Sequence, residues 1–170
     1  PNFKLKKNIL KVDGKFTFGQ IVMDMTCKKL LKIKNEIMLT SISNMAHFGR
    51  LTDYAKQLAD KGLISIFFAN GGGPNTAILP GRQRIVGTNP ICVGIPIKKN
   101  KNYIVDFATS ELAEGKMRIL QSEKKKWYKD FIVSKTGMFS KNPKSFMDGG
   151  ALIPFGGFKG SGLAFAAELL

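Results

Sequence analysis

The segment spanning residues 51–69 places a helical pattern directly before a strand pattern, and this order constrains the fold more than any other feature of the chain. Apolar side chains recur there at helical spacing, on Leu51, Tyr54, Ala55, Leu58 and Ala59. Such a stripe is typical of an amphipathic helix, and Gly62 predicts its C-terminal cap. Residues 63–69 follow as an apolar run, which predicts a strand covered on both faces.

The rest of the chain continues this alternation. Helical spacing predicts helices over residues 19–34, from about Glu111 onward, and after the glycine-rich segment 156–162. Apolar runs predict strands over residues 36–41, 91–97 and 103–107, with a turn at 98–102. Thr109 and Ser110 are expected to cap the helix near Glu111. Alternating helices and strands favour the α/β class.

Two segments lack a regular pattern. Residues 70–87 are rich in Gly, Pro and Asn and predict a loop. Residues 122–150 are polar and unevenly patterned, and we expect them to form a long surface excursion. With 170 residues and 44% hydrophobic content, the chain is one domain or part of a larger one.

The composition also bears on cell compartment and metals. No apolar run approaches the roughly 20 residues that cross a bilayer, and no charged-then-apolar leader is present, so we expect a soluble, cytoplasmic protein with no membrane partner. Cys27 and Cys92 lie in apolar segments without a Cys or His neighbour at metal-ligand spacing. They predict core thiols in a reducing compartment, with no metal site.

The net charge of +15 suggests nucleic-acid binding as an alternative function. Arginine occurs only at four positions, Arg50, Arg82, Arg84 and Arg118, and the lysines are spread through termini and loops. Proteins that recognise bases rely on arginine forks and stacked aromatic rings, so most of this charge is interpreted as solvated surface. A lysine-rich, non-catalytic α/β module that binds nucleic acid or another polyanion remains the competing hypothesis.

The two ends suggest an incomplete chain. It opens at Pro1 without a methionine and closes at Leu170 inside an apolar helical pattern, with no glycine cap or proline stop. We therefore expect a fragment.

His47, the single histidine, is the first candidate for chemistry. It lies between the strand expected at 36–41 and the helix that begins near Leu51. A strand-to-helix connection exposes a proton-transfer group while the flanking elements hold it still. An isolated histidine is more often a packed or solvated residue, so other motifs must decide between the two interpretations.

Two glycine-rich loops and one polar corner are candidate ligand sites. The loop from Asn70 to Asn75 follows a strand, but no amphipathic helix comes after it, so the Rossmann fingerprint fails. The segment 156–162 places Lys159 beside the N–H groups of a helix start, which suits a phosphate. Thr88-Asn89-Pro90 forms a rigid polar corner suited to an amide or carboxylate ligand, although an ordinary turn explains it equally well.

Taken together, four ordered motifs resemble the malate/L-lactate dehydrogenase family. They are Ser43-Asn44-x-x-His47-Phe48-Gly49, Arg82-x-x-x-x-Gly87-Thr88-Asn89-Pro90, Val105-Asp106-Phe107-Ala108-Thr109-Ser110 and Leu152-x-Pro154-x-Gly156-x-x-Lys159-Gly160-x-Gly162. The family comprises non-Rossmann NAD(P)-dependent 2-hydroxyacid oxidoreductases, including ureidoglycolate, sulfolactate and diketogulonate enzymes. The similarity runs from about Gly19 to Leu170.

The resemblance implies a homodimeric α/β enzyme with an atypical NAD(P)-binding fold, built on a mixed sheet flanked by helices. It implies that His47 is the proton acceptor or donor for a small 2-hydroxy or 2-oxo acid. Arg50 and Arg82 are the candidates to bind the substrate carboxylate, and Thr88 and Asn89 form the polar corner. The resemblance assigns cofactor contacts to Asn70, Gly71, Ile104, Val105, Asp106, Phe107, Ala108, Phe158 and Lys159.

The chain departs from the family pattern in three places. The family's N-terminal His-Gly motif with its arginine lies before this chain begins, and the C-terminal part that completes cofactor binding and the dimer is absent. Phe158 stands where many members have His, and Met45-Ala46 is inserted before His47. Residues 1–170 are therefore expected to be the central cofactor-binding part of such an enzyme, and an inactive truncated relic is a further alternative.

Overall fold

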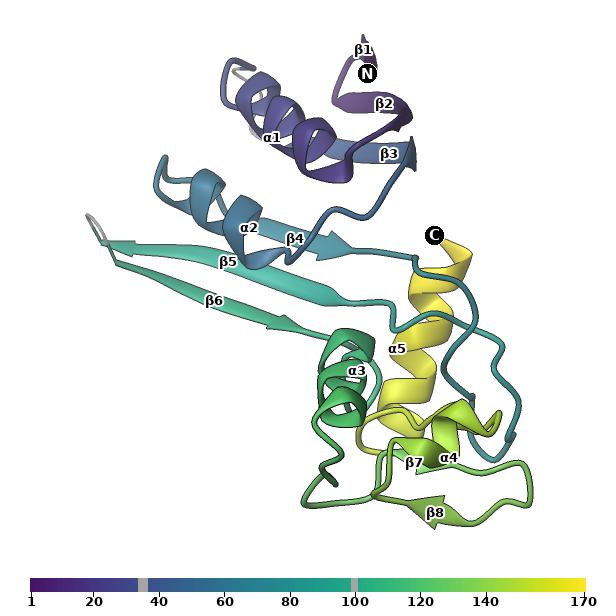
Figure 1. Cartoon of the computed structure of the whole chain (residues 1–170). Coiled ribbons are helices and arrows are strands. Elements are labelled where there is room, and N and C mark those ends of the chain that lie inside the picture. Colours follow the sequence, from purple (N-terminus) through teal and green to yellow (C-terminus); the bar gives the residue numbers. More distant parts are fainter. Residues whose placement is uncertain (34–36, 99–100) are drawn as a thin grey trace. The chain divides into compact units, whose positions relative to one another are not determined.

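The computed structural model describes residues 1–33, 37–98 and 101–170 (Figure 1). They form two compact units. The first unit consists of Pro1–Ile66 and Cys92–Asp106, and the second of Phe67–Ile91 and Phe107–Leu170. The expected helix end at Lys34, the expected strand start at Glu36 and the turn residues 99 and 100 lie outside the described residues.

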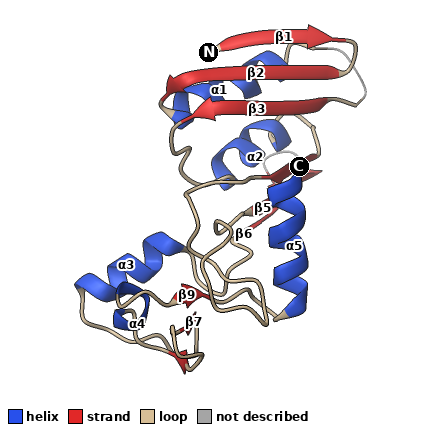
Figure 2. Ribbon diagram, turned by 90° about the vertical axis from the view of Figure 1, so that its right-hand side faces the viewer, coloured by secondary structure: helices blue, strands red, loops and turns tan. Residues whose placement is uncertain are grey.

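The first unit begins with a three-stranded sheet. Strands β1 (Asn2–Lys6), β2 (Ile9–Thr17) and β3 (Leu39–Met45) lie in the order β1-β2-β3, with β1 antiparallel and β3 parallel to β2. Parallel neighbours need a crossover connection, and helix α1 (Gly19–Leu30) provides it along one face of the sheet (Figure 2). Val22 of α1 packs with Leu10 and Val12 of β2, and all three are buried. The sequence patterns did not predict β1 or β2.

A second three-stranded sheet follows. Helix α2 (Thr52–Ala59) precedes β4 (Ser65–Phe68), β5 (Ile91–Lys98) and β6 (Lys101–Phe107), which lie in the order β4-β5-β6. Gly94 of β5 lets α2 approach, because a β-carbon there would lie 3.0 Å from the Cβ of Ala55. The helix predicted over 51–59 and the strands predicted over 91–97 and 103–107 are confirmed within two residues.

The second unit contains most of the remaining elements. These are α3 (Glu114–Ser122), β7 (Ile132–Val133), β8 (Phe139–Ser140), α4 (Lys144–Met147), β9 (Ala151–Leu152) and α5 (Phe158–Leu169). The short strands form an antiparallel sheet in the order β8-β7-β9. A core cluster gathers Leu112, Met117, Leu120, Phe131, Ile132, Phe146 and Leu152, with Trp127 packed against it.

The prediction that residues 122–150 form a surface excursion is wrong. Phe131 and Ile132 are fully buried, and Phe146 is 4% exposed. Ile132 lies on a two-residue strand, Phe131 directly precedes it, and Phe146 lies on a four-residue helix. Elements of this length are too short to produce a period of 2 or 3.6 in the sequence. This segment supplies a large part of the core of the second unit.

Three element predictions need correction. The strand predicted over 36–41 is instead β3, Leu39–Met45, and Leu39 is 65% exposed. The strand predicted over 63–69 is β4, and it is not covered on both faces, because Ile66 is 64% exposed and alternates with partly buried neighbours. The helix expected from Glu111 begins at Glu114 without a side-chain cap bond.

The expected caps of that helix have other partners. The Thr109 hydroxyl donates to the Thr88 carbonyl at 2.9 Å, and the Ser110 hydroxyl donates to the Leu112 carbonyl at 2.9 Å. Both residues are buried, so their hydroxyls stabilise the segment that enters the second unit.

The predicted α/β class is confirmed, with small sheets in place of one continuous sheet. None of the helices in the described ranges combines the length and the apolar character that spanning a membrane requires.

Candidate functional site

His47 lies in the connection between β3 and α2, two residues beyond the end of β3. This connection is fastened to the start of α1. The Ala46 N–H donates to the Thr17 carbonyl at 3.0 Å, and Gly19 permits a close approach, because a β-carbon there would lie 2.2 Å from the Ala46 carbonyl oxygen. The imidazole is thus exposed on a backbone that two other elements hold in place.

The ring of His47 has defined neighbours. Its Nδ1 accepts a hydrogen bond from the Gly49 N–H at 3.1 Å, and the ring stacks on Phe48 with a centroid distance of 5.9 Å. A nitrogen that accepts a hydrogen bond carries no proton, so Nε2 is the atom available to a ligand. Proton transfer through Nε2 requires Nδ1 to hold a proton, and the Gly49 contact must then open.

Asp106 fixes the start of the helix that follows His47. Its Oδ2 accepts bonds from both the backbone N–H and the hydroxyl of Thr52, each at 2.8 Å. A carboxylate at a helix N-terminus stabilises the helix. Asp106 therefore positions α2, and Ile104 and Val105 of the same strand are partly buried beside it.

Arg50 is paired within its own segment. Its guanidinium contacts both carboxylate oxygens of Asp53 at 2.9 Å, and these contacts raise the pKa of Arg50 and lower the pKa of Asp53. The pair is well exposed, so it contributes little to stability. The Arg50 guanidinium is available to another carboxylate only when its contacts with Asp53 open.

In the second unit, the polar corner joins the segment after β6. The Thr88 carbonyl accepts the backbone N–H of Thr109 at 2.8 Å as well as its hydroxyl. The Thr109 carbonyl in turn accepts the Phe155 N–H at 3.0 Å, and Phe107 meets the Phe155 ring edge-on, with centroids 5.4 Å apart. Ala108 is held between these contacts.

The loop after β4 approaches the same corner. A β-carbon on Gly87 would lie 2.3 Å from the Gly71 carbonyl oxygen and 2.6 Å from Oδ1 of Asn89. Only glycine allows this approach. By contrast, positions 71–73 have open space where a side chain would point, so the outer part of the loop is accessible to a ligand.

Asn89 is fully buried with a φ of 33°. Its Nδ2 donates to the Ala164 carbonyl at 2.9 Å and to Glu168 Oε2 at 2.8 Å, whereas its Oδ1 has no hydrogen-bond partner in the described structure. Asn70 also donates to Glu168, with Nδ2 lying 3.1 Å from Oε1. Sequence reasoning missed Glu168, because no motif marks a carboxylate near the end of a helix.

The start of α5 only partly matches its prediction. The segment 156–162 does open the helix, and Lys159 and Phe158 are exposed. The N–H groups of Lys159, Gly160 and Ser161 donate to the carbonyls of residues 156, 155 and 157, so these three are not free to bind a phosphate. The exposed ammonium of Lys159 is the side-chain group that suits one.

Both cysteines are free and buried, as predicted. Burial raises the pKa of each thiol to about 12. A thiol with so high a pKa is a poor nucleophile at neutral pH. In the described ranges, no group of three or more His, Cys, Asp or Glu residues is placed to hold a metal ion.

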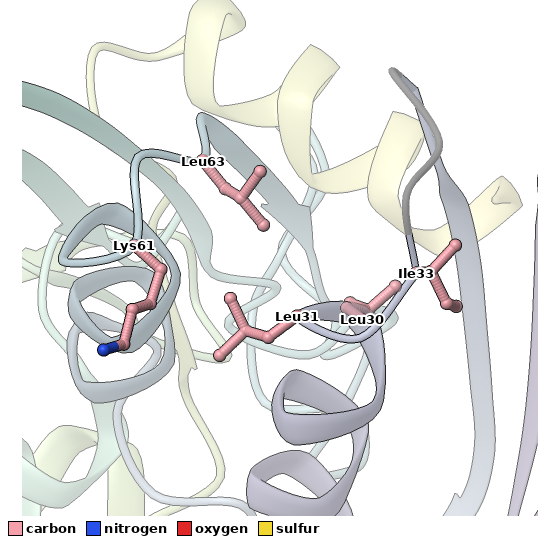
Figure 3. Close-up of a pocket in the computed structure, with 5 residues that line it drawn as sticks. All are labelled: Leu30, Leu31, Ile33, Lys61 and Leu63. Carbon is pink, nitrogen blue, oxygen red and sulfur yellow. The ribbon is translucent and has the colours of Figure 1, made fainter.

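A hollow of about 400 Å³ lies in the first unit, where α1 and α2 end (Figure 3). It is lined by Leu30, Leu31, Ile33, Lys61 and Leu63. None of the predicted site residues lines this hollow. Instead, the predicted residues divide between the two units: 47–50 and 104–106 belong to the first, and 70–71, 88–89, 107–108 and 158–159 belong to the second.

Curated relatives are found for nearly the whole chain. The Delta(1)-pyrroline-2-carboxylate/Delta(1)-piperideine-2-carboxylate reductase of Pseudomonas putida is 31% identical over 166 residues, covering 95% of this chain and 48% of the relative. Malate dehydrogenase of Pyrococcus abyssi is 30% identical over 168 residues, covering 94% and 46%. The chain thus spans about half the length of the curated relatives it matches.

Solved structures agree in fold. Delta1-piperideine-2-carboxylate reductase from Pseudomonas syringae superposes with a TM-score of 0.89 at 29% identity, covering 98% of this chain and 51% of that one. Sulfolactate dehydrogenase from Methanocaldococcus jannaschii gives a TM-score of 0.82 at 28% identity, covering 98% and 48%. The family model for malate/L-lactate dehydrogenase matches residues 3–170, which extends the similarity beyond the expected start at Gly19. The chain belongs to the malate/L-lactate dehydrogenase family.

Proposed function

We propose that the full-length protein is an NAD(P)-dependent oxidoreductase that interconverts a small 2-hydroxy acid and its 2-oxo acid. The observation that carries this proposal is the family match over residues 3–170. It is supported by relatives named malate dehydrogenase and L-sulfolactate dehydrogenase. We also propose that the protein is cytoplasmic, that it forms a homodimer, and that residues 1–170 are its central cofactor-binding part.

The residues of the second unit fit a nicotinamide dinucleotide. The glycines at 71–73 have open space where a side chain would lie, so a pyrophosphate can approach that backbone. The exposed ammonium of Lys159 forms no ion pair within the described part of the chain and suits a phosphate. These features accommodate NAD and NADP alike.

When bound, the cofactor supplies the hydride that is exchanged with C2 of the acid. In the proposal, His47 exchanges the substrate's hydroxyl proton through Nε2, after the bond between Gly49 and Nδ1 opens. Asp106 holds the N-terminus of α2 and so fixes the segment after His47. Thr88 and Asn89 maintain the corner against which the loop at 70–71 packs.

A second candidate reaction is reduction of a cyclic 2-imino acid. It is favoured by two relatives named as Delta(1)-pyrroline-2-carboxylate/Delta(1)-piperideine-2-carboxylate reductases. Both reactions deliver hydride to a carbon that bears a carboxylate, so the same site residues serve either substrate.

The test is oxidation of NADH and NADPH by the full-length protein with a panel of 2-oxo acids and cyclic 2-imino acids. The proposal expects turnover with at least one 2-oxo acid. Turnover restricted to imino acids would replace the first reaction by the second. Retention on heparin up to high salt, with no quenching of NADH or NADPH fluorescence, would instead favour the polyanion-binding alternative.

Replacement of Lys159 by alanine is expected to raise the cofactor dissociation constant about tenfold or more, because a charge-assisted contact is lost. Titration of nicotinamide fluorescence in the full-length protein measures the change. Lys116→Ala is a suitable control, since its ammonium lies over the Trp127 ring and no motif assigns it to the ligand site. Equal affinities for wild type and Lys159→Ala would contradict the phosphate role.

A further inference from the structure

Glu168 links two segments that the sequence motifs place in the ligand site. Its Oε1 accepts the side-chain amide of Asn70 at 3.1 Å, and its Oε2 accepts that of Asn89 at 2.8 Å. Asn70 begins the loop after β4, and Asn89 lies in the polar corner before β5. One carboxylate near the end of α5 therefore holds both segments.

The contacts also fix the orientation of the Asn89 amide. Its two N–H groups meet two acceptors, the Ala164 carbonyl and the Glu168 carboxylate. A flipped amide would direct Oδ1 at these same oxygens, which repel it. Oδ1 must therefore point away from α5, toward Gly87, where it is buried without a hydrogen-bond partner.

This orientation sets the shape of the glycine-rich loop. Asn89 Oδ1 and the Gly71 carbonyl oxygen both lie against Gly87, so the side chain of Asn89 and the backbone of the loop share one contact point. Glu168 thus holds the loop twice, directly through Asn70 and indirectly through Asn89. We propose that Glu168 is a positioning residue that holds the loop at 70–73 in the conformation that receives the cofactor.

The expected effect on cofactor binding rests on the proposed function, whereas the contacts of Glu168 do not. A carboxylate offers two acceptor oxygens, whereas glutamine offers one acceptor and one N–H donor. In Glu168→Gln, one of the two asparagine amides must face a donor. The contact to Asn70 is the one expected to break, because it is longer and exposed, whereas Asn89 is fully buried.

The first measurement is amide hydrogen exchange of the full-length protein without cofactor. Glu168→Gln is expected to exchange faster at residues 70–73, with little change in the first unit. The second is titration with NADH and NADPH, where the dissociation constant should rise about tenfold, since a hydrogen bond to a charged group is lost. The turnover number at saturating cofactor should change little.

A compensating variant separates positioning from general destabilisation. Glu168→Gln combined with Asn70→Asp exchanges donor and acceptor between the two positions and keeps the net charge of the pair. It should restore slow exchange at 70–73. Glu123→Gln is the matched control, because this exposed carboxylate pairs only with Lys125 among the contacts of the described residues.

The outcomes are distinct. Unchanged exchange at 70–73 in Glu168→Gln would overturn the positioning role, and so would failure of the compensating variant to restore it. If the wild type binds neither NADH nor NADPH, the proposed function fails, yet the exchange measurement still decides whether Glu168 positions the loop.

Discussion

Replacing His47 by asparagine in the full-length protein is expected to lower turnover about 100- to 10,000-fold, because general acid-base catalysis contributes that much. The cofactor dissociation constant should change less than about threefold if the imidazole acts on the substrate proton and not on the cofactor. The ring is exposed on a connection that the Thr17 and Gly19 contacts hold in place, so its loss should leave the fold intact. Steady-state rates, cofactor titration and melting curves on the same variant measure the three effects.

Two results would remove the proton-transfer role. If the cofactor dissociation constant rises by the factor by which kcat/KM falls, His47 is a cofactor contact. The bond from Gly49 to Nδ1 makes Nε2 a hydrogen-bond donor in the conformation seen, which is compatible with such a contact. If the variant melts at a lower temperature but retains turnover, His47 is a structural residue. His47→Gln is a useful second variant, because its amide can replace a hydrogen-bond donor but not a proton carrier.

Truncation of Phe131 to alanine is expected to lower the free energy of unfolding of the second unit by about 3–5 kcal/mol, the usual range for a fully buried phenylalanine. Its side chain is 0% exposed in the cluster that includes Met117 and Phe146. The single tryptophan, Trp127, packs against this cluster, so denaturant unfolding followed by tryptophan fluorescence reports the change.

The matched control is Phe139→Ala. Phe139 lies on β8, whose Ser140 carbonyl accepts the Phe131 N–H, but its side chain is 55% exposed, so the loss should stay near about 0.5 kcal/mol. A loss for Phe131→Ala as small as that for Phe139→Ala would contradict the burial of Phe131 in the core of the second unit.

The elements that the sequence predicted correctly are those that bury one face along their length. The stripe from Leu51 to Ala59 on α2 is such a case, because α2 packs on Gly94 of β5 along one side. The two-residue strands around Ile132 and Ala151 carry no such periodicity. They are stabilised by antiparallel pairing between segments distant in sequence, which a local pattern cannot reveal.

The ligand-site residues could be listed from the motifs, but their partners could not. Asp106 is a motif residue, yet its contact with Thr52 joins positions 54 residues apart. Glu168 matches no motif, although it contacts two motif asparagines. Hydrogen bonds of this kind depend on the packed backbone. The residues of a site can therefore be predicted from sequence motifs, whereas the hydrogen-bond network that orients them cannot.

Neither compact unit is a continuous stretch of sequence, because the chain passes between them after residues 66, 91 and 106. On the ribosome, residues 67–91 emerge well before residues 107–170, which complete their unit, and they must wait for those residues to be synthesised. A gene cut anywhere between codons 67 and 106 would leave each product with incomplete parts of both units. Recombination, gene fission or domain-swap engineering with a junction between residues 67 and 106 therefore divides both units.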